Sequence, residues 1–310
     1  MHTYVQLQPA HATLIYIFFV PVLQHKTSNS FIFTKMKTTG LVIAVLAIIL
    51  PFKIYCQTGY SDAGARTIAM GNASVTMVDV FSAQNNQAAL GYLEHGGGGI
   101  STLNYFMVDG GINSYYGVFA LPVKTSGTFG LTLNYKGDPT FNQSKIGLGY
   151  GRKLAEELAV GLQLDYIGTS ASEVGSGSAF TFDIGVLYKP AQNVTIGAKA
   201  FNPIRAKTGL DYEQELPAII NVGLNYHPSE KIYLCAEAEQ EIEEILRGKF
   251  GIEYQIIDQL FLRGGYVSNP SMFSCGIGLK IQQFKLDLAA QFHQQLGLSP
   301  GFGLSYDLSK

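Results

Sequence analysis

The chain has 310 residues, of which only 14% are charged, and its formal net charge is −2. Ordinary soluble domains carry roughly 25% charged residues, so this charge density is low. The nearly neutral balance gives no support for nucleic acid or an anionic surface as a partner. The longest apolar run, residues 41–52, is too short for a membrane-spanning helix, which needs about 20 residues. Any passage through a membrane must therefore be made by strands.

The first 56 residues have the layout of a leader. Met36 is followed by a lysine, the apolar run and a polar exit, as in a secretory signal peptide. We expect a signal peptide at residues 36–56 and an upstream extension at residues 1–35, although a longer leader that includes an upstream apolar stretch stays open. Cys56 lies where a lipid-modified cysteine would lie. The small residue expected before such a cysteine is replaced by Tyr55, which favours a mature chain without lipid.

Residues 57–96 do not alternate between polar and apolar side chains as the rest of the chain does. They contain small residues in short helical spacing, separated by polar breaks, and they run into the glycines of residues 96–99, which predict a flexible hinge. We expect a small helical or irregular N-terminal segment, separate from the strands that follow.

From residue 97 to residue 310 the pattern is that of β-strands. In residues 158–166, for example, large apolar side chains alternate with small or polar ones, which places them on opposite faces of a strand. The even number of such segments predicts a closed antiparallel barrel. The fourteen segments are 97–106, 112–121, 127–136, 143–152, 157–168, 178–189, 193–202, 216–227, 231–240, 246–255, 259–268, 272–282, 284–293 and 297–308.

The connections between these segments also alternate. Those after even-numbered segments are tight, whereas those after odd-numbered segments include long ones at 168–178 and 202–217. Short periplasmic turns and longer outer loops are typical of outer-membrane barrels. Five of the seven even-numbered segments also end in tyrosine, which favours the bilayer interface but is also a good strand former in general. These tyrosines are Tyr150, Tyr188, Tyr226, Tyr254 and Tyr306.

The length of the strands fits a membrane. About ten residues at 3.4 Å each, tilted by roughly 40°, span about 26 Å, close to the apolar band of such barrels. A soluble β-sandwich or propeller would need a charged outer face, and the polar face here is mostly Gly, Ser, Thr and Asn. The sequence therefore predicts an all-β fold: a 14-stranded antiparallel transmembrane β-barrel in the outer membrane, with a small N-terminal hatch.

Strand parity places a set of charged residues on the polar, lumen-facing side of the predicted barrel. Pairs between these residues and the hatch would hold the hatch in place, and a ring that selects a ligand is the alternative. The acidic run from Glu237 to Glu244 is expected to be a solvated loop, with a divalent-cation site as the alternative. The lumen candidates are Asp165, Asp183, Lys199, Glu237, Glu253, Arg263 and Asp287, with Asp307 near the end of the chain.

Catalytic chemistry finds little support. His293 is the one histidine expected in an outer loop, and neither Ser271 nor Ser299 offers it a hydrolase motif. No metal-ligand spacing, phosphate-binding loop or haem motif is present, so we expect no enzyme activity, no metal and no cofactor. Cys235 shares the polar face and Cys275 the apolar face, which predicts two unbridged thiols.

The N-terminal segment resembles the hatch signature of the FadL and PorV/PorQ outer-membrane families. That signature has a Gly-x-Arg-Ala or Gly-Ala-Arg start, a Gly and an Ala a few residues on, an acidic residue and then Asn-Pro-Ala. Gln87 occupies the proline position, which makes the turn less rigid and weakens the transfer of a ligand-gating role. The matching residues are Gly64-Ala65-Arg66, Met70-Gly71, Ala73, Asp79 and Asn86-Gln87-Ala88, preceded by Asn85.

The resemblance implies a fourteen-stranded barrel whose lumen is obstructed by the hatch. In the FadL branch, hydrophobic molecules are captured from outside and pass through the barrel wall or past the hatch. In the PorV branch, the barrel is a type IX secretion component that receives exported cargo. Our first hypothesis is passive uptake of small hydrophobic compounds, and our second is docking of secreted cargo or secretion partners. Lipid, a hydrophobic small molecule or a secretion protein would then be the partners.

Overall fold

The computed structural model describes residues 62–108, 110–123, 126–172, 175–209, 214–242 and 244–308. The expected leader, the start at Met36 and Cys56 lie outside the described residues. In the described part of the chain, no helix combines the length and the hydropathy needed to cross a bilayer.

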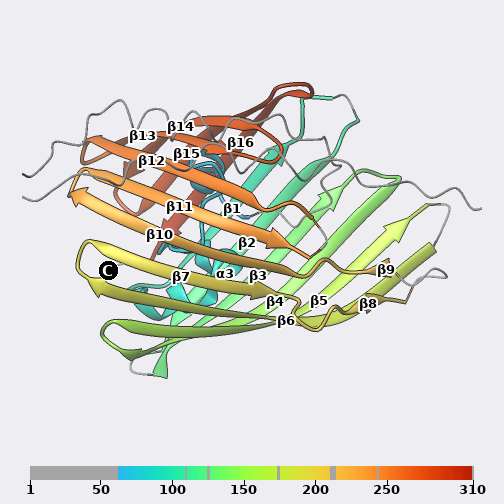
Figure 1. The fold of residues 1–310 in the computed structure, drawn as a ribbon, viewed down its shortest axis with the longest axis horizontal. Helices are drawn as coiled ribbons and strands as arrows, with labels where there is room; N and C mark the ends of the chain where they lie inside the picture. Colours follow the sequence, from blue (N-terminus) through green and yellow to red (C-terminus); the bar gives the residue numbers. More distant parts are fainter. Residues whose placement is uncertain are drawn as a thin grey trace, which may run out of the picture. The chain divides into compact units, whose positions relative to one another are not determined.

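Fourteen strands form a closed antiparallel barrel, as the sequence predicted (Figure 1). The barrel closes where β1 pairs with β16, with Gly97 opposite Asp307. The strands are β1 (Gly97–Asn104), β2 (Asn113–Pro122), β3 (Thr128–Gly137), β4 (Phe141–Ala155), β5 (Leu158–Ala171), β6 (Gly175–Ala191), β7 (Val194–Phe201), β10 (Ile219–Ser229), β11 (Ile232–Glu241), β12 (Arg247–Ile257), β13 (Leu260–Val267), β14 (Met272–Ile281), β15 (Phe284–His293) and β16 (Gly297–Asp307).

The long connection between β7 and β10 contains a feature that the sequence pattern did not reveal. Two short strands within it, β8 (Lys207–Thr208) and β9 (Gln214–Glu215), pair with each other outside the barrel ladder. Strands of two residues are too short to show alternation, so the sequence pattern could not predict them.

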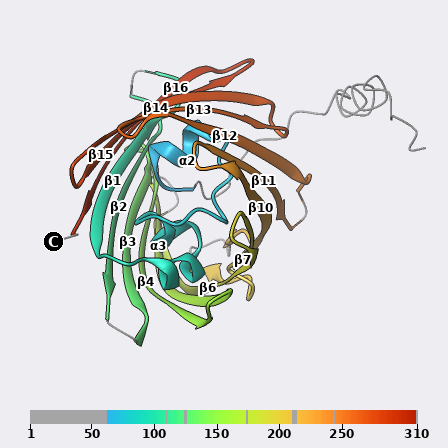
Figure 2. The ribbon, with the colours of Figure 1, turned by 90° about the vertical axis from the view of Figure 1, so that its left-hand side faces the viewer.

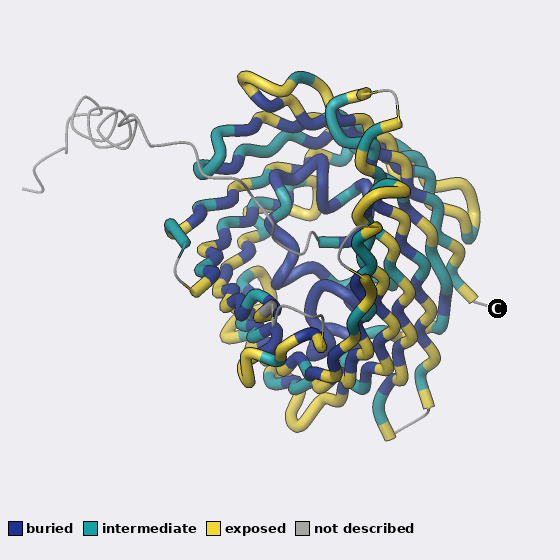
Figure 3. The backbone as a smooth tube through the Cα atoms, turned by 90° about the vertical axis from the view of Figure 1, so that its right-hand side faces the viewer, coloured by how far each residue is buried: buried dark blue, intermediate teal, exposed yellow. Residues whose placement is uncertain are grey.

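The apolar face of the sheet points outward. On β5, Gln163 and Asp165 are buried in the lumen, whereas Leu162, Leu164 and Tyr166 are exposed. Figure 3 shows this alternation between buried and exposed residues around the wall. A closed barrel satisfies its backbone hydrogen bonds internally, and its apolar exterior suits lipid rather than water. The prediction of an outer-membrane barrel is confirmed, and the soluble alternative is wrong because the outer face is not charged.

The expected tyrosines gather at the tight-turn end of the barrel. Tyr188, Tyr226, Tyr254 and Tyr306 are exposed on the outer face, and the Tyr306 ring lies 4.8 Å from that of Phe284. Tyr150 is half-buried and donates a hydrogen bond to the Ser126 carbonyl oxygen. Their position fits an interfacial girdle, which stays a prediction.

The N-terminal segment lies inside the barrel, where it fills the lumen (Figure 2). It contains helices α2 (Ala65–Ala69) and α3 (Ser82–Asn85) and the 3-10 helix η1 (Gln87–Tyr92). Helix α2 packs near β13 to β16, and η1 packs near β3 to β6. Wall glycines permit this close approach, because a Cβ added to Gly161 or Gly265 would collide with the hatch backbone.

The outward apolar face generates a stability prediction. Leu164 lies in the middle of β5, and we expect Leu164→Arg to lower the free energy of unfolding by about 2–4 kcal/mol because the charge enters the bilayer midplane. Leu154, near the tight-turn end of β4, is equally exposed at 61%. Leu154→Arg should cost only about 0–1 kcal/mol, since it lies near the interface. Urea titration in lipid vesicles measures both, and equal costs would contradict the membrane placement.

Candidate functional site

The lumen and the hatch that fills it form the candidate site. Seven of the eight lumen residues proposed from strand parity are less than a tenth exposed, and the eighth, Asp307, lies half-buried at the end of β16. The hatch and the wall satisfy these charges in three clusters, built on Lys145, on Glu253 and on Lys249. The inward residues are Asp165, Asp183, Lys199, Glu237, Glu253, Arg263 and Asp287.

The Lys145 cluster joins four neighbouring strands to the hatch. Lys145 Nζ on β4 lies 3.2 Å from Asp165 Oδ2 and 3.5 Å from Asp183 Oδ2. Lys199 Nζ on β7 lies 3.4 Å from the same Asp183 oxygen and donates to the Gln84 carbonyl oxygen of α3 at 2.7 Å. Two cations balance two anions, so charges that would be costly to bury alone are matched.

The Glu253 cluster anchors helix α2. Arg66 donates two hydrogen bonds to the Glu253 carboxylate, at 2.8 and 2.9 Å, and also pairs with Asp79 at 3.2 Å. Arg263 donates to Glu253 at 2.5 Å and to Asp287 at 2.6 Å. Burial disfavours the charge on Arg66, but the Glu253 and Asp79 carboxylates hold the pKa of Arg66 well above its ordinary value. The hatch is thus tied to the wall by a bidentate ion pair.

The Lys249 cluster overturns the expectation of a solvated acidic loop. Glu237, Glu239 and Glu241 point into the lumen and are buried, because alternate residues of β11 share its inner face; Glu243 lies outside the described residues. Lys249 Nζ lies 3.0 Å from Glu237 and 2.7 Å from Glu239. Arg247 pairs with Glu239 and Glu241.

The Lys249 cluster also contains the carboxylates that could form a divalent-cation site. Oxygen atoms of Asp62, Glu237 and Glu239 lie within 4.8 Å of one another. The ammonium group of Lys249 contacts all three carboxylates, at 3.0, 3.0 and 2.7 Å. A lysine therefore already occupies the position that a metal ion would take.

The residues of the hatch motif shape the hatch itself. Gly64 and Gly71 adopt positive φ angles of 104° and 66°, which glycine tolerates best. Asn85 exchanges two hydrogen bonds with the backbone of Ala63, at 2.8 and 2.9 Å. Asn86 donates to the Val75 carbonyl oxygen at 2.7 Å and accepts from Ala88 N.

Asp79 and Gln87 of the motif also form hydrogen bonds within the hatch. Asp79 accepts a hydrogen bond from Phe81 N at 2.9 Å and so shapes the turn that leads into α3. Gln87, in the position of the family's proline, is fully buried and donates to the Ala83 carbonyl oxygen at 3.0 Å. Its side chain is thus bonded within the hatch.

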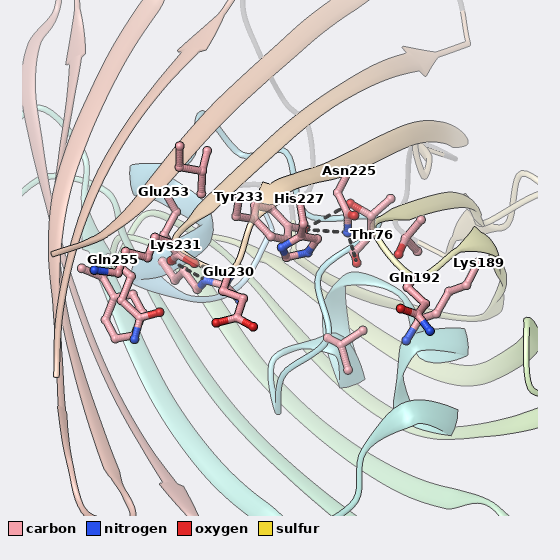
Figure 4. A pocket seen from close by; sticks show the side chains of 15 residues that line it. Thr76, Lys189, Gln192, Asn225, His227, Glu230, Lys231, Tyr233, Glu253 and Gln255 are labelled. Carbon is pink, nitrogen blue, oxygen red and sulfur yellow. Dashed lines mark hydrogen bonds and ion pairs between the residues drawn. The ribbon is translucent and has the colours of Figure 1, made fainter. Parts of the chain in front are cut away.

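A cavity of about 300 Å³ lies between the hatch and the wall at the tight-turn end. Figure 4 shows Asn225, His227 and Tyr233 side by side at its centre, where dashed lines join Asn225, Tyr233 and Thr76. The cavity is lined by Arg66, Thr76, Val78, Lys189, Gln192, Thr195, Asn225, His227, Glu230, Lys231, Ile232, Tyr233, Glu253, Gln255 and Phe261.

On the loop side, the ladder between β6 and β7 ends before β6 does, and we call this place the wall interruption. Strand β7 ends at Phe201, opposite Asp183, so its ladder with β6 stops there while β6 extends back to Gly175. Residues 202–209 and 214–218 lie in the chain that connects β7 to β10. Asn202 fastens this chain by donating from its backbone N to the Phe182 carbonyl oxygen at 3.1 Å and from its side chain to the Leu216 carbonyl oxygen at 2.9 Å.

Buried apolar side chains lie just inside this interruption. They form one cluster around Phe201 and are drawn from β5, β6, β7, β10 and the connecting chain. On the outside, Phe180 is 75% exposed on the apolar face. The cluster consists of Ile167, Ala179, Phe201, Leu216 and Ile219.

The residues considered for catalysis have structural roles. His293 Nδ1 accepts hydrogen bonds from Gln295 N and Leu296 N, which shapes the turn before β16. Ser299 accepts a hydrogen bond from Phe106 N.

Cys235 is buried, Cys275 is exposed, and both are free thiols.

Sequence reasoning missed three cations of the lumen: Lys145, Arg247 and Lys249. Lys145 shares the parity of the inward glycines of β4, and Lys249 shares that of Glu253. Strict alternation along each strand would have found them. Their partners could not be foreseen, because each lies on a different strand or on the hatch.

The Lys145 cluster generates a prediction about stability. Lys145→Met leaves two buried carboxylates with one cation, and should lower the free energy of unfolding by about 3–5 kcal/mol. The double variant Lys145→Met/Asp165→Asn restores the balance, because Asp183 keeps Lys199. It should therefore lose less stability than the single variant in urea titrations. A double variant as unstable as the single one would contradict this pairing.

The Arg66 anchor generates a second prediction. Arg66→Gln removes the ion pairs to Glu253 and Asp79, and chymotrypsin should then cleave after Phe81 in the hatch about tenfold faster. The control is Arg205→Gln, which removes a solvent-exposed pair with Glu215 that contributes little. Gel analysis of the fragments measures both rates, and equal cleavage of the two variants would count against the anchor.

Comparisons with known proteins find the fold rather than a sequence family. No family model matches the chain, and no curated protein matches it in sequence. Solved structures do match, each at low identity. They include the toluene transporter TodX of Pseudomonas putida (TM-score 0.65, 12% identity, 81% of this chain and 99% of that chain). A Pseudomonas aeruginosa FadL homologue matches with a TM-score of 0.59 and 14% identity, over 83% of this chain and 100% of that one.

The CymD monoaromatic hydrocarbon channel aligns with a TM-score of 0.58 and 12% identity, over 80% of this chain and 98% of that one. Since these matches cover nearly the full length of the solved chains, the likeness extends to the whole barrel. The chain therefore has the fold of FadL-type outer-membrane barrels.

Proposed function

We propose that this protein is an outer-membrane channel that admits small hydrophobic molecules passively, as a member of the FadL family. The observation that carries the proposal is the pairing of a stoppered lumen with an interrupted wall. The hatch is tied to the wall in all three clusters, by ion pairs in two of them and by the hydrogen bond from Lys199 to the Gln84 carbonyl oxygen in the third. Such a lumen does not resemble an open aqueous pore. A cargo that can leave the bilayer sideways needs no such pore.

The wall interruption suits an apolar cargo. A hydrophobic molecule in the outer part of the bilayer would meet Phe180 on the outside of β6 and the Phe201 cluster on the inside. Transfer between two apolar environments requires little desolvation. The connecting chain that covers the gap is fastened chiefly through Asn202, whose side chain also accepts hydrogen bonds from Thr181 and Ala206 N.

The structural neighbours support the same cargo class. One is described as a toluene transporter and another as a monoaromatic hydrocarbon channel. At their level of identity the likeness concerns the fold, so the choice of a small hydrophobic cargo for this chain rests on the wall interruption. The second role weighed from the sequence, docking of secreted cargo or secretion partners, gains no support from these neighbours. Catalysis is not part of the proposal.

Uptake into liposomes tests the proposal. Vesicles that contain the protein should take up a hydrophobic fluorescent probe faster than protein-free vesicles, while sucrose enters both equally slowly. Phe201→Asp places a charge in the apolar cluster and should slow probe uptake about tenfold, equivalent to about 1.4 kcal/mol. The control, Phe141→Asp, introduces the same charge on the exposed loop end of β4 and should leave uptake unchanged. Rapid sucrose entry, or equal uptake by both variants, would argue against this function.

A further inference from the structure

Two hollows lie on the same side of the lumen, along β7, β10 and β11. The lower one is the cavity at the tight-turn end, which these strands line with Thr195, Asn225 and Tyr233. The upper one is a small hollow of about 20 Å³ on the loop side of the hatch. It is lined by Asp62, Gln84, Lys199, Phe201, Ile219, Asn221 and Glu239. Phe201 and Ile219 also belong to the apolar cluster behind the wall interruption.

A single layer of the hatch separates the two hollows. Because inward residues alternate, Gly197 on β7 and Gly223 on β10 lie between the residues that line the lower and the upper hollow. Both face Val75 of the hatch. A Cβ added to Gly197 would lie 2.6 Å from the Val75 carbonyl oxygen, and one added to Gly223 would lie 2.6 Å from Val75 Cγ1. The segment Ala73–Thr76 thus fills the space between the hollows.

Glu237 on β11 holds this segment to the wall. Its Oε2 accepts hydrogen bonds from two successive backbone amides, Ser74 N at 2.7 Å and Val75 N at 2.8 Å. Its Oε1 accepts from Asn221 at 2.6 Å and from Lys249 at 3.0 Å, which fixes the carboxylate. Hydrogen bonds to an ionised acceptor are about twice as strong as neutral ones.

The other contacts of the segment with the wall are longer. Asn225 donates to the Thr76 carbonyl oxygen at 3.3 Å, and the Thr76 hydroxyl lies 3.4 Å from the Tyr233 hydroxyl. Each hollow is also bordered by a buried acceptor without a hydrogen-bond partner in the described part of the chain, Gln84 Oε1 above and Asn225 Oδ1 below.

The rest of the hatch is fastened elsewhere. Helix α2 is held by Arg66 on Glu253, and η1 packs against β4 and β5 on the far side of the lumen. Within the hatch, Asn86 donates to the Val75 carbonyl oxygen at 2.7 Å. Displacement of Ala73–Thr76 therefore breaks this bond and the bonds to Glu237, while the anchors of both helices stay in place.

We propose that Ala73–Thr76 is the gate of this barrel and that Glu237 is the residue that positions it closed. Displacement of the segment joins the two hollows into one passage along β7, β10 and β11. The passage leads from the apolar cluster behind the wall interruption to the tight-turn end. This inference rests on the proposed function, for which it supplies the exit route.

Single-channel recording in KCl tests the gate without any hydrophobic cargo. Glu237→Gln keeps the size of the side chain but weakens its hold on the two amides, and the open fraction should rise about tenfold over the wild type. The control is Asp258→Asn, which neutralises an exposed carboxylate at the tight turn between β12 and β13, outside the three clusters. Its open fraction should equal that of the wild type.

A second pair of variants acts without touching Glu237. The three atoms nearest to the methyl group of Gly197→Ala all belong to the hatch, on Val75 and Thr76, so this variant should also raise the open fraction. Its control is Gly117→Ala on β2, where the nearest atom is 3.8 Å away on Leu133. Equal open fractions for Gly197→Ala, Glu237→Gln and their controls would overturn the gate.

Probe uptake by the same liposomes separates this inference from the proposed function. If both gate variants open in KCl but no liposome takes up the hydrophobic probe, the gate stands and the cargo is wrong. If the wild type takes up the probe while the gate variants conduct no more than their controls, the function stands and the gate is wrong.

Discussion

The structure depends on one constraint: a barrel with an apolar exterior must satisfy its polar inner face from within. Water would do this in an open pore, whereas here the hatch does it. Carboxylates that would be costly to bury alone are matched by cations from neighbouring strands or from the hatch. Glu253 shows this most directly, because one carboxylate accepts from Arg66 of the hatch and from Arg263 of the wall. Wall and hatch therefore stabilise one another.

The same constraint explains how the hatch is attached. Where it meets the wall through helices, glycines on the strands allow backbone to approach backbone. Where it meets β11, the link is a carboxylate on two amides, which is strong but local. Between these attachments lies one thin segment, Ala73–Thr76, whose strongest link to the wall is the Glu237 carboxylate. The wall interruption and this segment lie on the same sector of the barrel, which is why uptake and exit can be connected in one path.

Much of the fold could be predicted from the sequence because a strand has a period of two. Leu162 and Leu164 alternate with Gln163 and Asp165, and that pattern sufficed for the strand count, the outward apolar face and the lumen side of the charged residues. Tight connections after every second strand sufficed for the topology. The acidic residues from Glu237 to Glu241 were misjudged as a solvated loop, because consecutive alternate glutamates resemble a polar loop when their partners are unknown.

Periodicity therefore determined the barrel, the orientation of its faces and the membrane in which it lies. Tertiary structure alone decided which cation meets which carboxylate, where β7 stops short, and which hatch residues contact Gly197 and Gly223. These features depend on residues far apart in the chain, such as Arg66 and Glu253, or Val75 and Glu237. Alternation along one strand carries no information on register against a separate segment, and only the folded barrel brings the two together.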